Sequence, residues 1–199
     1  MDYYATIAGH FQSTIETIAL SADDLAGPIE SASQMMTRAL LEDHKIIVCG
    51  NGADAALAHL FTCNLLSRFE HDRPALPALA LTGDGAALTA IGNTAGANDI
   101  FSRQLRALGQ AGDVLLCISS AGADSSLLRA VQAAHERNME VIALSNSGGT
   151  QLGTLIRSED VDIRVDSERR PQIVEMHALV INCLCELLDL SLFGPYTQD

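Results

Sequence analysis

Apolar and polar positions along this chain follow two different patterns, one typical of strands and one typical of helices. From residue 45 onward, short apolar runs are separated by segments with the three-to-four-residue apolar spacing of helices. Strands that alternate with helices indicate an α/β fold with a mainly parallel sheet. The predicted strands are KIIVCG, PALAL, DVLLCIS, EVIALS and VDIRV, at residues 45–50, 77–81, 113–119, 140–145 and 161–165.

The last predicted helix is apolar around most of its circumference. It covers residues 170–193, RPQIVEMHALVINCLCELLDLSLF. A surface helix shows one apolar stripe, so this helix should be covered on several sides, with a partner subunit as the expected cover. The other helices predicted after the first strand lie near residues 53–69, 86–108 (broken around GNTAGAND), 124–137 and 149–156.

The first 43 residues contain no strand pattern. Apolar residues at helical spacing occur at positions 7, 11, 15 and 18, and again at 25, 29, 32, 36 and 40 after SADD, which has the character of a helix start. This pattern predicts two N-terminal helices that either pack on the fold or form a subunit interface. The expected organisation is one domain over 1–199, with a helical pair at 1–43, an α/β core at 44–193 and a tail at 194–199.

Composition narrows the class of protein. The chain has 199 residues, is 48% hydrophobic, and carries 12 Lys and Arg against 25 Asp and Glu, a net charge of -13. Direct binding to nucleic acid would need a local basic patch, and Arg169 with Arg170 is the one adjacent basic pair. Five cysteines, most of them in apolar runs, are typical of a reducing compartment. With no signal peptide or membrane-span pattern, we expect a cytoplasmic protein that contacts neither nucleic acid nor membrane directly.

The stretch CGNGADAA has the layout of a phosphate loop, because a strand runs through a glycine turn into a helix. Asp54 places an anion where an anionic ligand would be expected. Gly50, Gly52 and Ala55 satisfy the dinucleotide fingerprint, which also needs an acidic residue about 20 positions on. The nearest candidate, Asp84, is 32 residues after Gly52, which argues against a nucleotide site. A sugar-phosphate loop and a purely structural turn remain.

A second polar turn follows the predicted strand DVLLCIS. Hydroxyls and free N–H groups in ISSAGADSS, residues 118–126, could cradle a phosphate at a helix N-terminus. Asp124 is an equally good N-cap that would satisfy the helix without a ligand. The candidate ligand-binding residues of the two turns are Asn51, Gly52, Ser119, Ser120 and Ser125.

These turns, with GNTAGANDIFSRQLRALGQAGDVLLCIS and IVEMHALVINCLCELLD, resemble the sugar isomerase (SIS) domain of the phosphoheptose isomerase family. They are similar above all to its DnaA initiator-associating members, and the resemblance covers nearly the whole chain. It implies a five-stranded parallel sheet flanked by helices, a three-layer arrangement like flavodoxin or Rossmann folds. It also implies a homotetramer with helices at its centre.

The resemblance also locates a catalytic zinc site, in which family members hold the metal with His, Glu, Gln and His. One Glu and one His of that set move protons between C1 and C2 of sedoheptulose 7-phosphate. The matching positions here are Leu60, Asn64, Val174 and Asn182. None can shuttle a proton near neutral pH, and Leu and Val cannot bind zinc. We therefore expect no metal, no cofactor and no catalytic residue at these positions.

His177 and Glu175 match the family's E-x-H pattern on the last helix. His177 is a weak catalytic candidate, because a histidine without a Glu or metal partner has no second group with which to exchange the substrate proton. A hydrogen-bonded histidine at a subunit contact is the favoured alternative.

Leu192 and Phe193, near the chain end in DLSLFGPYTQD, are candidates for partner binding. In the initiator-associating relatives an aromatic residue at this place belongs to the surface that binds the initiator, and an exposed Phe would suit such a contact. Packing against the N-terminal helices is the alternative.

The sequence thus favours a non-catalytic homotetramer that acts as a scaffold or regulator of replication initiation and reaches DNA through a replication initiator protein. Two alternatives stay open. One is a phosphoheptose isomerase whose chemistry has moved to His59 and His177. The other is a sensor that binds a sugar or sugar phosphate without converting it.

Overall fold

The computed structural model describes residues 2–121, 124–148 and 150–195. Its centre is a five-stranded, fully parallel sheet in the order β2-β1-β3-β4-β5. The predicted strands are confirmed within one or two residues at each end. Their bounds are Ile46–Gly50 for β1, Ala78–Ala80 for β2, Val114–Ile118 for β3, Glu140–Asn146 for β4 and Val161–Val165 for β5.

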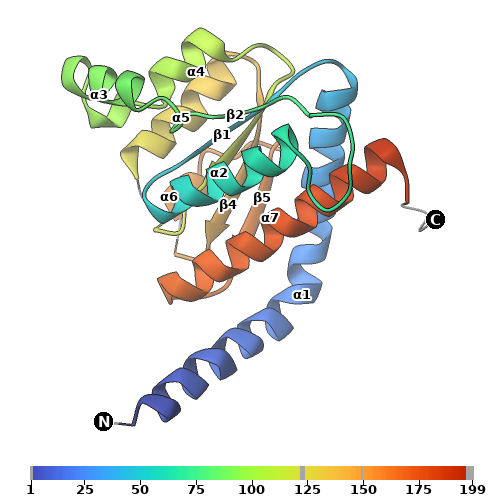
Figure 1. Cartoon of the computed structure of the whole chain (residues 1–199). Coiled ribbons are helices and arrows are strands. Elements are labelled where there is room, and N and C mark those ends of the chain that lie inside the picture. The colour runs from blue at the N-terminus through green and yellow to red at the C-terminus, as the bar shows by residue number, and fades with distance from the viewer. Residues whose placement is uncertain (1, 122–123, 149, 196–199) are drawn as a thin grey trace.

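Helices cover both faces of the sheet, which gives the three layers visible in Figure 1. A buried apolar cluster on one face joins the sheet to α1, α2 and α7, and a second cluster on the other face joins it to α4 and α5. Burial on both sides explains why the central strands are continuously apolar. The helices are α1 Tyr3–Leu41, α2 Ala53–Leu66, α3 Gly85–Thr94, α4 Ser102–Leu108, α5 Ser125–Glu136, α6 Thr150–Gly153 and α7 Arg170–Phe193, with a 3₁₀ turn η1 at Ala97–Asp99.

The N-terminal segment is one continuous helix, so the prediction of two helices is wrong. Helix α1 runs through SADD and through Pro28 without a break. Ser and Asp are weak helix breakers that packing can override. Pro28 removes one helical hydrogen bond and crowds the carbonyl of Asp24, a local cost that the packing of α1 offsets. Buried residues occur on both sides of Pro28, for example Leu25 and Ala32, so one apolar stripe continues across the proline. The first half of α1 projects from the body, as Figure 1 shows.

Helix α7 is long and apolar enough to cross a membrane by composition alone. In the structure it lies against α1, α2 and the sheet, and residues such as Ile181 and Leu184 are fully buried. The chain itself therefore covers one side of the helix, and a partner subunit over its outer side stays a prediction. Leu179 and Leu190 stay exposed on its outer side.

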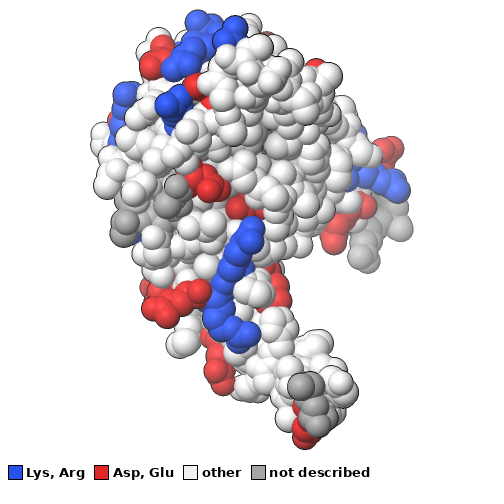
Figure 2. Space-filling model, turned by 90° about the vertical axis from the view of Figure 1, so that its left-hand side faces the viewer, with Lys and Arg blue, Asp and Glu red and all other residues white. Residues whose placement is uncertain are grey.

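On the face that Figure 2 shows, Lys and Arg side chains form a column near the centre and a group at the upper left. Lys and Arg side chains are interspersed with Asp and Glu over this face, and the projecting part is mostly uncharged. The acidic side chains beside both groups reduce the positive charge by which this face could attract the phosphate backbone of nucleic acids.

Candidate functional site

Three neighbouring strands end at one edge of the sheet and place polar residues together there. Asn51 follows β1, Ser119 and Ser120 follow β3, and Asn146 ends β4. In parallel sheets the carboxyl ends of the strands form the usual ligand crevice. A cavity of about 460 Å³ opens at this edge, and its lining residues include Ser120, Asn146, Ser147, Ser167, Glu168 and Arg170.

Ser120 connects the residues of this site. Its backbone N–H and its hydroxyl both donate to Oδ2 of Asp54, at 2.9 and 3.0 Å. Its carbonyl accepts a hydrogen bond of 2.7 Å from Nδ2 of Asn146. Its hydroxyl oxygen also accepts from Nε of Arg170, at 3.3 Å. Ser120 is only 2% exposed, so these contacts fix the end of β3 firmly.

Asp54 is buried behind Ser120, with 1% of its surface exposed. Burial raises the pKa of its carboxyl group, while the hydrogen bonds from Ser120 and the positive charge of Arg170 act in the opposite direction. We expected Asp54 to meet the ligand directly. Its position instead shows that its Oδ2 binds donors of the chain itself.

Asn51 links the first turn to the second. Its Nδ2 donates to Oδ2 of Asp124 at 3.0 Å and to the hydroxyl of Ser126 at 2.9 Å. Asp124 stands at the N-cap position of α5, yet its side chain makes no capping hydrogen bond. The alternative in which Asp124 satisfies this helix as an N-cap is therefore not what the structure shows.

Gly52 has the unusual backbone conformation of the first turn. Its φ of 59° lies in the left-handed region, which favours glycine. A Cβ on Gly52 would lie 3.9 Å from Nη2 of Arg170, so the start of α7 lies near this turn.

The other two candidate serines are not among the described residues that line the cavity. Ser119 is buried, and its N–H donates to the carbonyl of Leu144, which continues the sheet. Ser125 begins α5 and is exposed.

Several residues of the site were not predicted from the sequence, among them Ser126, Asn146 and Arg170. Asn146 could have been found, because it ends the strand next to β3. Arg170 carries no local signal, since 50 positions separate it from Ser120.

His177 and His59 do not line the cavity. His177 is fully buried, its Nε2 donates to the carbonyl of Ser145 at 3.1 Å, and its Nδ1 has no partner among the described residues. Burial lowers the pKa of His177 to about 4, so the imidazole is neutral. It is a hydrogen-bonded core histidine, buried by its own chain rather than at a subunit contact. His59 bonds the hydroxyl of Thr82 at 3.0 Å on the outer side of α2.

The positions that match the family's zinc ligands do not fit a zinc ion. Leu60 and Val174 offer no donor atom. The amide of Asn64 donates to the sulfur of Cys185 at 3.8 Å, across the contact between α2 and α7. Among the described residues, no three His, Cys, Asp or Glu side chains cluster as metal ligands would.

The two candidate partner-binding residues lie at the end of α7. Leu192 is partly buried against the apolar cluster that α1, α2 and α7 share. Phe193 is 40% exposed, and the centre of its ring lies 6.0 Å from the guanidinium carbon of Arg73. Neither belongs to the cavity at the strand ends.

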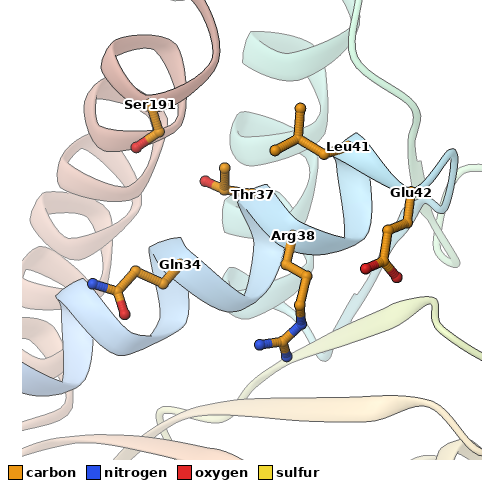
Figure 3. A pocket seen from close by; sticks show the side chains of 6 residues that line it. All are labelled: Gln34, Thr37, Arg38, Leu41, Glu42 and Ser191. Atoms are coloured by element: carbon orange, nitrogen blue, oxygen red, sulfur yellow. The ribbon is translucent and has the colours of Figure 1, made fainter.

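A second hollow, of about 310 Å³, lies where the ends of α1 and α7 meet. Figure 3 shows Gln34, Thr37 and Arg38 along α1, with Ser191 contributed by α7. Arg38 is already engaged, because its Nη2 donates to both carboxylate oxygens of Glu140 at 2.7 Å. This hollow lies away from the strand ends and we assign no chemistry to it.

The chain matches the SIS domain family over residues 10–146. It is 46% identical to a phosphoheptose isomerase of Chromohalobacter salexigens over 194 residues, 98% of each chain. It is 42% identical to that of Coxiella burnetii over the full length of both. The solved phosphoheptose isomerase of Francisella tularensis superposes with a TM-score of 0.92 at 40% identity, covering 95% of this chain and 99% of the other.

These matches correct the function expected from the sequence. Proteins that align with the chain from end to end are named phosphoheptose isomerases, so the expectation of a non-catalytic regulator of replication initiation is wrong. Partner binding by Leu192 and Phe193 stays a prediction. The predicted fold is confirmed, because the five-stranded parallel sheet and its flanking helices match the solved isomerases. The chain belongs to the SIS domain family, in its phosphoheptose isomerase group.

Proposed function

We propose that the protein binds a phosphorylated sugar, of the heptose phosphate class, in the cavity at the ends of β3 and β4. The contact between Arg170 and the Ser120 hydroxyl in the wall of this cavity carries the proposal. A guanidinium is the side chain best suited to a phosphate, since it is always charged and offers several N–H groups in one plane. The volume of about 460 Å³ is in the range of small-molecule sites.

The rest of the cavity suits the sugar hydroxyls. Ser147, Ser167 and Glu168 line it beside Asn146, so hydroxyl and carboxylate groups surround the space next to Arg170. Carboxylate and hydroxyl oxygens accept hydrogen bonds from sugar O–H groups, which orients the ligand without metal.

Isothermal titration calorimetry with sedoheptulose 7-phosphate, and with unphosphorylated sedoheptulose as control, tests binding. The phosphorylated sugar should bind clearly more tightly than the free sugar. Equal heats for both, or none for either, would refute the proposal.

Isomerisation of the same sugar phosphate is the second candidate function. The observation that favours it is the 46% identity to a phosphoheptose isomerase over 98% of each chain. Relocation of the chemistry to His59 and His177 has no support, because neither imidazole lines the cavity. A coupled assay for conversion of sedoheptulose 7-phosphate, with and without added zinc, tests this function separately from binding.

We also propose that the chain works as a homo-oligomer, a tetramer as the family resemblance implies. The projecting half of α1 exposes Tyr3, Tyr4, Ile7, Phe11 and Ile15, each at more than half of its surface. An apolar groove of about 620 Å³ between α1 and α7 continues this surface. Exposed apolar area of this extent favours association with further copies. All five cysteines are free, which fits the cytoplasm as the proposed place of action.

A further inference from the structure

Two hydrogen bonds from Ser120 hold the carboxylate of Asp54 directly behind the wall of the cavity. Both donors reach the same oxygen, Oδ2, at 2.9 and 3.0 Å, and both residues are almost fully buried. A carboxylate held by a backbone N–H and a hydroxyl is bound in the way that such turns bind phosphate oxygens. The chain therefore fills this small anion site with its own side chain.

This arrangement changes what the turn after β3 can offer to a ligand. The N–H and O–H of Ser120 point to Asp54 and are not free for a phosphate. A phosphate placed next to them would also meet the negative charge of Asp54 across a short distance. The turn can hold a phosphate only if another group supplies the positive charge.

Arg170 supplies that charge at the same place. Its Nε donates to the Ser120 hydroxyl, and its Nη2 lies 3.9 Å from the position of a Cβ on Gly52. The guanidinium therefore lies near both the turn after β1 and the turn after β3. Neither Nη1 nor Nη2 donates to a residue that the structure describes, and the side chain is exposed. Two N–H-bearing nitrogens are therefore available to a ligand oxyanion.

We infer that Asp54 occupies the anion site of the turn after β3, and that Arg170 has become the residue that recognises the phosphate of the ligand. This inference rests on the proposed function, whose binding site it specifies. Asp54 excludes phosphate from the Ser120 donors, and Arg170 binds it in front of them. Specificity for a phosphorylated ligand then depends on one side chain rather than on the backbone of two turns.

The negative charge of Asp54 can be tested separately from the shape of its side chain. Its second oxygen, Oδ1, is buried and has no hydrogen-bond partner among the described residues. Replacement by Asn keeps the shape of the side chain and an oxygen for Ser120 but removes the negative charge. The Asp54→Asn protein therefore isolates the effect of the charge on a bound phosphate.

The experiment measures binding of inorganic phosphate and of sedoheptulose 7-phosphate by calorimetry in the wild type and its variants. Arg170→Ala should weaken both ligands by about tenfold or more, since a charged hydrogen-bond partner is lost. Asp54→Asn should tighten both, because a like charge is removed from beside the phosphate. Arg169→Ala is the matched control, since the Arg169 guanidinium donates to Ser13 on α1 and not to Ser120, and its affinity should stay within about twofold of wild type.

The combined variant Asp54→Asn with Arg170→Ala completes a double-mutant cycle. Arg170→Ala should reduce the ligand affinity by a smaller factor in the Asp54→Asn background than in the wild type. Without the carboxylate, the N–H and O–H of Ser120 are bound less tightly within the chain and can donate to the phosphate instead. Equal affinity of wild type and Arg170→Ala for both ligands, or weaker phosphate binding by Asp54→Asn, would overturn the inference.

The two ligands separate this inference from the proposed function. If inorganic phosphate binds in an Arg170-dependent manner while no sugar phosphate binds more tightly than phosphate, the assignment of Arg170 holds and the proposed ligand is wrong. If sedoheptulose 7-phosphate binds wild type and Arg170→Ala equally well, the proposed function holds and the inference is wrong. Circular dichroism of each variant checks that it is folded.

Discussion

Arg73 and Asp189 form an ion pair inside the protein, with Nε of the arginine 2.8 Å from Oδ1 of the aspartate. Their side chains are only 2% and 3% exposed. Arg73 also donates to the carbonyls of Leu65 and Asn64 at the end of α2, at 2.7 and 2.8 Å. The pair therefore ties the segment before β2 to the ends of both α2 and α7.

Removing the acidic partner should destabilise the protein strongly. Asp189→Asn leaves the guanidinium of Arg73 buried without a counter-charge, which typically costs about 3–5 kcal/mol. Urea unfolding at neutral pH measures this loss. The exposed pair of Arg106 and Glu136, at 2.9 Å, is the matched control, and Glu136→Gln should cost less than about 1 kcal/mol. Similar losses of unfolding free energy for both variants would show that burial of the Arg73 pair does not determine its contribution to stability.

The acid stability of the protein should depend on His177. Its folded pKa of about 4 lies below the ordinary 6.5, because burial disfavours the imidazolium. The unfolded chain therefore binds more protons than the folded one between these values. The stabilising contribution of neutral His177 to the free energy of unfolding is fully present above pH 6.5. It is lost as the pH falls toward 4, by about 3 kcal/mol at most.

His177→Gln tests this directly, because glutamine can still donate to the Ser145 carbonyl but does not titrate. Unfolding free energies at pH 7.5 and at about pH 4.5 should differ less for the variant than for the wild type. The raised pKa of Asp54 acts in the opposite direction and is common to both proteins, so it cancels in the comparison. Parallel pH curves would contradict the expectation.

The strand pattern was sufficient to predict the sheet, because the central predicted runs are buried on both faces and bounded by polar turns. The N-terminal segment was mispredicted for a physical reason. Local preferences of Ser21, Asp23 and Asp24 indicate a helix start, but the buried contacts of Leu25 and Ala32 carry the helix through. Tertiary packing therefore overrides the local preference of these residues for a helix start.

The site was only partly predictable. Ser120 and Asn51 follow strands, and that local signal sufficed to find them. The part played by Asp54 could not be read from its neighbours, because its partner Ser120 lies 66 positions away. The same holds for Arg170, which a different helix brings to the turn. Residues that act through long-range contacts leave no pattern in a single sequence.

Restoring the family's ligand set should create a zinc site. Residues 60 and 64 are one helical turn apart on α2, residues 174 and 182 are about two turns apart on α7, and these helices are in contact. The variant Leu60→His, Asn64→Glu, Val174→Gln and Asn182→His therefore carries His, Glu, Gln and His on two facing helices.

This variant should bind about one zinc ion per chain, whereas the wild type should bind none at this place, because Leu60 and Val174 have no donor atoms. Metal content after dialysis and the shift in melting temperature with added zinc report binding without any activity assay. A control with Leu60→His alone should bind no better than wild type. A folded variant with no zinc would show that the helices are not aligned as in the isomerases.

Association of the chain should depend on the projecting half of α1. Phe11 and Ile15 are 66% and 58% exposed and lie one turn apart on one face of the helix. Replacing both with Glu places charges in the proposed contact, where burial of an unpaired charge is costly. Sedimentation velocity should show wild type as a tetramer and the double variant as smaller species, with unchanged helical content.

The control for this prediction is Gln34→Lys, which adds a charge farther along the same helix, in the half that packs on the body. Gln34 is exposed and bonds Glu30, so a lysine there keeps a favourable neighbour one turn away. Its sedimentation coefficient should equal that of wild type. If wild type sediments as a monomer at micromolar concentration, the exposed face of α1 is not a subunit interface. If Phe11→Glu with Ile15→Glu leaves a tetramer intact, the contact lies elsewhere, with the groove between α1 and α7 as the remaining apolar surface.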